Sequence, residues 1–229
     1  MRKLVLFDID GTIMNTDSGG ASSCQETLQE IFNRPVSLDD YMMSGKTDTQ
    51  IVLELMEREG VDRDVTTENL DAIYDGYIDR LNREVAVWDP EICPGIPVLV
   101  ESLSQMDEVL LGLLTGNIKR GAEVKLNQIG LWSYFKTGAF GDRAPERKLL
   151  PGIAQKVAEE QIGKRFEKKD IVIIGDTPND ILCGRDLNVK AIAVATGSYD
   201  VETLGSYDPD YLFEDLSDTD RVVEAIMST

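Results

Sequence analysis

Aspartate and threonine side chains follow three short apolar segments of the chain. They are Asp8, Asp10, Thr115, Asp176 and Asp180. Carboxylates can act as nucleophiles, transfer protons and bind cations, and a hydroxyl group can hold an anion. Each of these residues taken alone is typical of a loop or a helix cap. Because ligands bind beyond the carboxyl ends of the strands in an open parallel sheet, their shared position indicates one site.

A group of converging carboxylates predicts a bound cation. Two carboxylates about 4 Å apart repel by roughly 4 kcal/mol at an effective dielectric constant near 20, so several need a counter-charge to stay ionised. The chain has no histidine, and its three cysteines form no CxxC pair, which argues against a zinc site. Oxygen ligands alone indicate a hard divalent ion. Mg²⁺ fits best because it takes few carboxylates and keeps waters and substrate phosphate.

The composition excludes several classes of function. The 229 residues include 23 Lys and Arg against 42 Asp and Glu, a formal net charge of −19. That balance argues against nucleic acid and against an anionic membrane surface as partners. The absence of histidine excludes Ser-His-Asp and Cys-His catalysis. Widely spaced cysteines and an N-terminal apolar run too short for export predict a cytoplasmic protein.

Apolar segments and helical patterns alternate along most of the chain. The apolar segments, which predict buried strands, are Lys3–Phe7, Val109–Leu114, Ile171–Ile174 and Ala191–Ala195. The helical patterns are Ile118–Ile129, Leu149–Gln161 and Asn179–Leu187. Strands that alternate with helices predict an α/β fold with a doubly wound, Rossmann-like parallel sheet and helices on both faces.

One stretch interrupts this alternation with consecutive helical patterns. They cover Ser22–Phe32, Thr47–Glu59 and Thr66–Arg83, with no strand pattern between them. We therefore predict a helical cap at residues 15–86, inserted into an α/β core formed by residues 1–14 and 87–229.

Three stretches resemble motifs of the haloacid dehalogenase superfamily. Phe7-Asp8-Ile9-Asp10-Gly11-Thr12 resembles the first motif, Leu113-Leu114-Thr115-Gly116-Asn117 the second, and Gly175-Asp176-Thr177-Pro178-Asn179-Asp180 the fourth. They occur in the family's order and span nearly the whole chain. The predicted helical insert is similar to the cap of the phosphoglycolate phosphatase-like branch.

The resemblance implies a role for each matching residue. Asp8 would be the nucleophile that forms an aspartyl-phosphate, and Asp10 the general acid and then the general base. Asp8, the backbone carbonyl of Asp10 and Asp176 would hold Mg²⁺. Asp180 would lie close behind them. Residues that shape the phosphate-binding loops or hold the phosphoryl group would be Gly11, Thr12, Thr115, Gly116 and Asn117.

The basic residue of the third motif is less defined. Many relatives have Lys-Pro there, whereas this chain has Arg143-Ala144-Pro145-Glu146-Arg147-Lys148. The preceding Gly138–Asp142 stretch is similar to a subset that uses arginine. We take Arg147 as the candidate with Lys148 as the alternative, since either would neutralise Asp8 and bind phosphate. Arg143 fits a solvated basic loop.

Lys46 lies in the predicted cap. It would either meet a distal anionic group of the substrate or be an exposed lysine at a helix start.

These residues predict a cytoplasmic, Mg²⁺-dependent phosphatase that hydrolyses a small phosphorylated metabolite. A dehalogenase transfers no phosphoryl group and typically lacks the second aspartate, so Asp10 favours phosphate-ester chemistry. The alternatives are a phosphomutase of the same lineage, similar to β-phosphoglucomutase, and a non-catalytic binding protein on the same scaffold. A monomer or a small homo-oligomer is expected.

Overall fold

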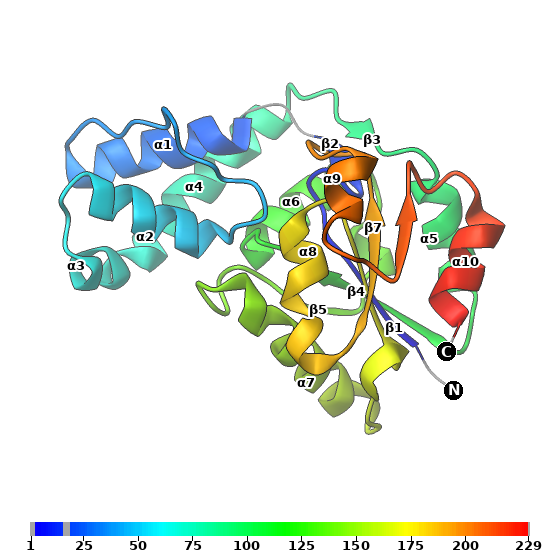
Figure 1. Cartoon of the computed structure of the whole chain (residues 1–229). Helices are drawn as coiled ribbons and strands as arrows, with labels where there is room; N and C mark the ends of the chain where they lie inside the picture. The colour runs from blue at the N-terminus through cyan, green and yellow to red at the C-terminus, as the bar shows by residue number, and fades with distance from the viewer. Residues whose placement is uncertain (1–2, 16–18, 229) are drawn as a thin grey trace.

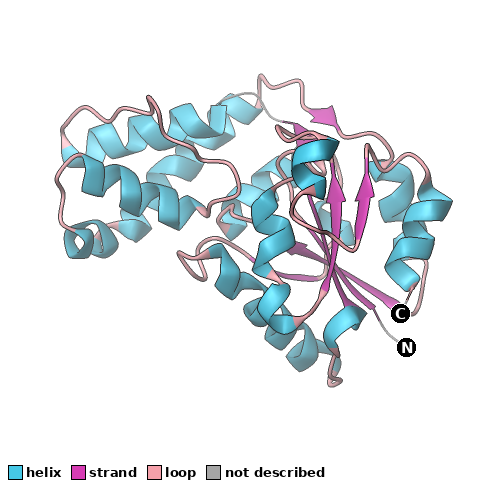
Figure 2. Cartoon of the chain, in the orientation of Figure 1, coloured by secondary structure: helices cyan, strands magenta, loops and turns pink. Residues whose placement is uncertain are grey.

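A six-stranded parallel sheet lies between two layers of helices (Figures 1 and 2). The computed structural model describes residues 3–15 and 19–228. The strand order is β5-β4-β1-β6-β7-β8. The strands are β1 Lys3–Phe7, β4 Val109–Leu114, β5 Thr137–Ala139, β6 Ile171–Gly175, β7 Lys190–Val194 and β8 Tyr211–Phe213. The predicted α/β, doubly wound fold is confirmed.

Alternating side chains of the central strand β1 pack on opposite faces of the sheet. Val5 and Phe7 belong to the cluster with α5 (Ile96–Ser104), α6 (Lys119–Gln128) and α10 (Thr219–Met227). Leu4 and Leu6 face the other layer. The helices of that layer are α7 (Leu150–Ile162), α8 (Pro178–Cys183) and α9 (Val201–Gly205). Short 3₁₀ turns lie at Trp132–Tyr134, Arg147–Leu149, Lys168–Asp170 and Arg185–Leu187.

Four helices between β2 and β3 pack together beside the sheet and are called the helical unit here (Figure 1). They are α1 Gly19–Phe32, α2 Asp48–Arg58, α3 Arg63–Glu68 and α4 Leu70–Val85. The unit has its own apolar core, which contains Leu28, Ile51, Leu55, Met56 and Ile73. β2 (Met14–Asn15) pairs antiparallel with β3 (Glu91–Ile92), so the chain enters and leaves the unit side by side.

The prediction of one continuous helix over Thr66–Arg83 is wrong, because α3 ends and α4 begins on either side of Asn69. The Asn69 backbone N–H bonds to the carbonyls of Thr66 and Thr67. Its side-chain Nδ2 donates to the Val65 carbonyl at 2.8 Å and so takes the acceptor that a continuing helix would use. Such side-chain competition with the backbone is typical of asparagine.

None of the helices in the described residues is long and apolar enough to cross a membrane.

Two buried lysines fix the end of α10 against the sheet. Lys3 and Lys190 are each 2% exposed. Lys190 Nζ donates to the carbonyl oxygens of Ala225, Ile226 and Ser228 and to the Ser228 hydroxyl, at 2.6 to 3.3 Å. A cation at the C-terminus of a helix also complements its dipole.

Replacing Lys190 with methionine should lower the free energy of unfolding by about 1–3 kcal/mol, because buried carbonyl groups then lose a charged donor. Urea unfolding followed by circular dichroism measures the change. Lys156→Met, at a side chain that is 77% exposed, is the matched control and should change stability by less than about 0.5 kcal/mol. Equal effects of the two variants would contradict this role of Lys190.

Candidate active site

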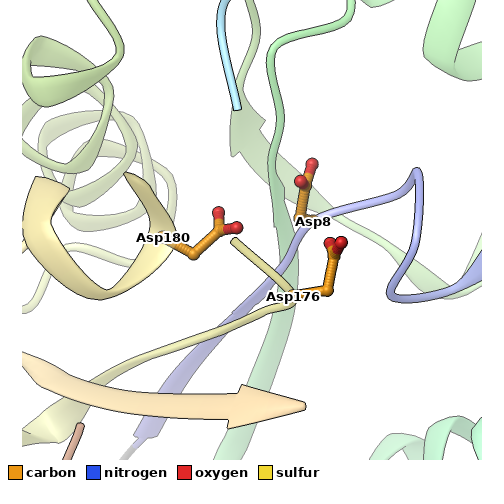
Figure 3. Close-up of side chains that lie close together, drawn as sticks. All are labelled: Asp8, Asp176 and Asp180. Atoms are coloured by element: carbon orange, nitrogen blue, oxygen red, sulfur yellow. The ribbon is translucent and has the colours of Figure 1, made fainter. Parts of the chain in front are cut away.

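Three buried carboxylates converge at the carboxyl ends of the central strands (Figure 3). Asp8 directly follows β1, Asp176 directly follows β6, and Asp180 lies in the first turn of α8. One ligand oxygen from each lies within 4.8 Å of the others. Because β1 and β6 are neighbours in register, the sheet itself brings the first two acids together.

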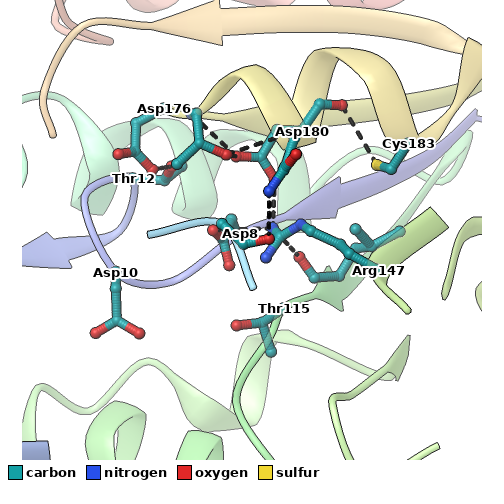
Figure 4. A network of polar contacts seen from close by, with 12 residues as sticks. Asp8, Asp10, Thr12, Thr115, Arg147, Asp176, Asp180 and Cys183 are labelled. Carbon is teal, nitrogen blue, oxygen red and sulfur yellow. Dashed lines mark hydrogen bonds and ion pairs between the residues drawn. The ribbon is translucent and has the colours of Figure 1, made fainter. Parts of the chain in front are cut away.

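Arg147 supplies the positive charge of this cluster. Its Nη2 lies 3.0 Å from Asp8 Oδ2 and also contacts Asp180 Oδ1 (Figure 4). Arg147 is 6% exposed. By contrast, Lys148 pairs with Glu146 on the surface, and Arg143 is exposed. Of the three basic residues considered from the sequence, the structure places Arg147 alone against Asp8.

Asp180 is held by the start of its own helix. Its Oδ2 accepts hydrogen bonds from the Thr177 backbone N–H at 3.0 Å and from the Thr177 hydroxyl at 2.6 Å. The Asp180 N–H in turn donates to Thr177 Oγ1 at 3.3 Å, which completes a capping box. With Arg147 on the other oxygen, both oxygens of Asp180 are engaged within the protein.

Asp176 keeps one oxygen available. Oδ1 accepts a hydrogen bond from Thr12 Oγ1 at 3.0 Å. Two glycines make room for the carboxylate: a Cβ on Gly11 would lie 2.3 Å from Oδ2, and one on Gly197 would lie 1.8 Å from it. Gly11 also has φ +84°, a conformation that favours glycine.

The Asp10 carboxylate is turned away from the three acids (Figure 4). It contacts Lys125 Nζ at 2.7 and 2.8 Å and accepts a hydrogen bond from Asn117 Nδ2 at 2.7 Å. The Asn117 amide also donates to Thr115 Oγ1 at 2.9 Å, and the Asn117 backbone N–H donates to the same oxygen at 3.3 Å. Asn117 therefore ties the second predicted motif to the first.

Lys125 was not among the residues singled out from the sequence. It is 5% exposed, and it lies on the buried face of α6, three residues after Ala122 and one before Leu126. The sequence does place Lys125 among the apolar residues of an amphipathic helix. A lysine in that position is expected to be buried and therefore to need an acidic partner. The partner, Asp10, is 115 residues away in sequence.

The helical unit docks on the loop that follows β4. The Asp48 N–H donates to the Gly116 carbonyl at 2.7 Å, and Asp48 Oδ2 accepts from the Ile118 N–H at 2.8 Å. Gly116 is required here, because a Cβ on it would lie 2.0 Å from the Lys46 carbonyl oxygen. The hydroxyls of Thr47 and Thr49 donate to carbonyls of the loop after β5, at 2.6 and 2.5 Å.

A cavity of about 530 Å³ lies between the helical unit and the acidic cluster. One part of its wall carries Asp8, Asp10, Thr115, Arg147 and Asp176. Lys46 also lines it, but its Nζ lies 2.6 Å from Glu54 Oε2 and 4.2 Å from the centre of the Tyr41 ring. Lys46 is therefore neither an isolated surface lysine nor an unpaired cation.

A family model described as haloacid dehalogenase-like hydrolase matches residues 5–194. The chain belongs to this family. The resemblance inferred from the three motifs is confirmed.

Relatives of known name cover almost the whole chain. A phosphoglycolate phosphatase of Agrobacterium fabrum is 27% identical over 222 residues, covering 93% of this chain and 89% of the relative. Pyrophosphatase PpaX of Oceanobacillus iheyensis is 24% identical over 225 residues and covers 96% of both. The crystal structure of β-phosphoglucomutase from Clostridium difficile superposes with a TM-score of 0.72 at 17% identity, covering 99% of this chain and 97% of that one. This last likeness shows the shared fold.

Burial raises the pKa values of Asp8 and Asp176 in this haloacid dehalogenase-like hydrolase. The pKa of Asp8 rises to about 6, mainly through burial, although the Arg147 guanidinium lowers it. The pKa of Asp176 rises to about 8 through burial and through the neighbouring charges of Asp180 and Asp8. Without a cation, the folded cluster therefore holds protons that the unfolded chain has released at neutral pH.

The substitution Asp176→Asn should stabilise the metal-free protein at pH 8.5, on the order of 2–3 kcal/mol, because it removes a charge that folding buries. A group whose pKa is raised by folding gives stability that is present at acid pH and lost as the pH rises through the folded pKa. The advantage of the variant should therefore shrink toward zero near pH 4. Denaturant unfolding of both proteins in chelator, across this range, measures it. If Asp176→Asn is less stable than the wild type at pH 8.5, the buried charge of Asp176 does not destabilise the metal-free fold.

Proposed function

We propose that the protein is a Mg²⁺-dependent phosphatase that hydrolyses small phosphorylated metabolites through an aspartyl-phosphate on Asp8. The observation that carries this proposal is the convergence of Asp8, Asp176 and Asp180 with Arg147. Of these four residues all but Asp180 line the cavity, together with Asp10. Family membership and the two phosphatase-named relatives support the same chemistry.

Asp8 is suited to be the nucleophile. Arg147 holds Oδ2 and so fixes the orientation of the carboxylate. The other oxygen can then attack phosphorus, forming the acyl-phosphate bond as the bond to the leaving oxygen breaks. A guanidinium at this position also offsets the charge of the phosphoryl group.

Thr115 is suited to hold a phosphoryl oxygen. Its Oγ1 already accepts two hydrogen bonds from Asn117, so the hydroxyl proton can be donated outward to an anion. Thr115 is 0% exposed to solvent, and a donor fixed in a site of low dielectric stabilises developing charge strongly.

Asp10 is suited to proton transfer in both steps. As an acid it would protonate the leaving oxygen. It would then take a proton from the water that attacks phosphorus and releases Asp8. Lys125 and Asn117 stabilise the ionised form, which is the form that accepts the proton from water.

The donor set fits Mg²⁺. The candidate ligands are oxygens alone, and one carboxylate oxygen from each of Asp8, Asp176 and Asp180 lies within 4.8 Å of the others. Asp8 and Asp176 would hold the ion together with the Asp10 backbone carbonyl. Asp180, whose oxygens are both engaged, would support them from behind. When bound, the ion would neutralise the acids and polarise a phosphoryl oxygen.

We also propose that residues 15–86 act as a cap over the site, with residues 1–14 and 87–229 as the catalytic core. The paired strands β2 and β3 at the entrance and exit of the helical unit support a hinge there. Opening would admit substrate, and closure would exclude bulk water from the reacting atoms. The proposed setting is cytoplasmic, as a monomer or a small homo-oligomer.

The variant Asp8→Asn should lose at least about 10³-fold in kcat for p-nitrophenyl phosphate hydrolysis in the presence of Mg²⁺, because an amide cannot act as the nucleophile. Release of p-nitrophenol, followed by absorbance, measures the rate. Asp107→Asn, at an exposed aspartate, should keep the wild-type rate.

An inert wild-type protein, or an Asp8→Asn variant with unchanged rate, would contradict the phosphatase proposal. Isomerisation of a phosphosugar in the presence of its bisphosphate, without phosphate release, would identify a mutase instead.

Removing Mg²⁺ with EDTA should abolish the activity, and excess Mg²⁺ should restore it. At a Mg²⁺ concentration 100 times its Kd, binding should stabilise the wild-type fold by about 2.7 kcal/mol, or several degrees in melting temperature. The shift should be largely lost in Asp176→Asn, which removes a ligand charge. Full activity in chelator, or an equal thermal shift in both proteins, would count against metal binding here.

A further inference from the structure

The cavity extends well past the phosphoryl end into the helical unit. A volume of about 530 Å³ lies in the range of pockets that enclose whole organic ligands. The helical unit contributes the charged residues Lys46 and Asp48 to the cavity wall, and also Cys24, Ile51, Val52, Ile73, Tyr74 and Tyr77. These last six residues make the apolar and aromatic part of the wall, which is suited to contact the leaving group of the substrate.

Every cation that lines the cavity in the described part of the chain already contacts a carboxylate. Lys125 is paired with Asp10, and Arg147 with Asp8 and Asp180. The third, Lys46, is paired with Glu54.

The partner of Lys46 is itself firmly held. Glu54 also accepts hydrogen bonds from the Tyr41 hydroxyl and from Gln50 Nε2, each at 2.7 Å. Although partial burial opposes it, these bonds and Lys46 lower the pKa of Glu54. Glu54 therefore stays ionised and neutralises Lys46.

The charge balance disfavours a second anionic group on the substrate. Four aspartates line the cavity, namely Asp8, Asp10, Asp48 and Asp176, against three cations. One divalent ion would offset one phosphoryl group. No uncompensated positive charge then remains for a carboxylate or a second phosphate.

Tyr77 offers a neutral hydrogen-bond donor in the apolar part. The residue is 7% exposed and lines the cavity. Its hydroxyl has no hydrogen-bond partner among the residues that the structure describes, and it lies next to Gly20, another lining residue, where an added Cβ would be 3.6 Å away. The hydroxyl is not among the fully buried polar atoms that lack a partner, so it is accessible from the cavity and can donate to a bound ligand. Burial raises the pKa of Tyr77, so the proton stays in place.

We propose that the substrate is a phosphate monoester whose leaving group is uncharged, partly apolar, and accepts a hydrogen bond from Tyr77. The proposal rests on the phosphatase function above and names the substrate class of that site. Tyr77 and the Lys46–Glu54 pair together set the specificity. Tyr77 donates a hydrogen bond to the leaving group, and Glu54 neutralises Lys46 so that no free cation attracts a charged leaving group.

The test compares three benzyl phosphates of similar size. They carry a carbamoyl group, a carboxylate or hydrogen at the para position. In the presence of Mg²⁺, kcat/KM for 4-carbamoylbenzyl phosphate should exceed that for 4-carboxybenzyl phosphate at least tenfold. An equal or faster reaction of the carboxylate would overturn the proposal.

Two variants test the roles proposed for Glu54 and Tyr77. Glu54→Gln keeps an acceptor but removes the charge beside Lys46, so it should raise the carboxylate-to-carbamoyl ratio of kcat/KM at least fivefold. Tyr77→Phe should lower the carbamoyl-to-unsubstituted ratio about fivefold or more, because of these two probes only the carbamoyl one has a para group that accepts a hydrogen bond. Unchanged ratios in these two variants would overturn the assigned roles.

Matched controls are available on the same chain. Glu57→Gln removes a charge from α2 at an exposed residue paired with Arg63, and Tyr134→Phe removes a surface hydroxyl bonded to Glu101. Neither should change the ratios. Melting temperatures report whether each variant is folded. Failure to release phosphate from any probe, including p-nitrophenyl phosphate, would overturn the phosphatase function as well. Release with a preference for the carboxylate would overturn the substrate class alone.

Discussion

The repulsion among Asp8, Asp176 and Asp180 is the constraint on which the rest of the site depends. Each pair of such charges costs roughly 4 kcal/mol at about 4 Å, and all three are buried. Arg147 and the Thr177 cap offset the charge on the protein side. The negative charge that they leave uncompensated would favour the binding of a cation. The site is thus under electrostatic strain that a divalent ion would relieve.

This constraint explains why residues around the cluster are small or hydroxylated. Gly11 and Gly197 leave the space that Asp176 occupies, and Thr12 supplies a hydrogen bond to it. Larger residues at the glycines would displace the carboxylate.

The helical unit is hydrogen-bonded to the loops that follow β4 and β5. Asp48 bonds to both Gly116 and Ile118, next to the Thr115 and Asn117 side chains that form the proposed phosphate site. Movement of the unit would break these bonds and free the loop, so the proposed closure would also organise the proposed phosphate site. The same docking encloses the apolar wall with which the leaving group would be selected.

The sequence by itself determined the fold class, the family and the set of acids. These rest on local patterns that appear in the amino-acid order, because β1, β4 and β6 are apolar runs that end directly before Asp8, Thr115 and Asp176. The short edge strand Thr137–Ala139 was not predicted from the sequence, because its three residues form no apolar run and are a strand only through their pairing with β4. The break at Asn69 escaped it because one side-chain hydrogen bond decides it.

Only the tertiary structure decided which cation meets which acid. Arg147 rather than Lys148 reaches Asp8, Lys125 holds Asp10, and Glu54 neutralises Lys46. The first two of these pairs join residues more than 100 positions apart. The sequence favoured Arg147 over Lys148 only through a resemblance to other chains, and it singled out neither Lys125 nor Glu54. The physical reason is that burial and distance set the strength of a charge interaction, and both are properties of the folded chain.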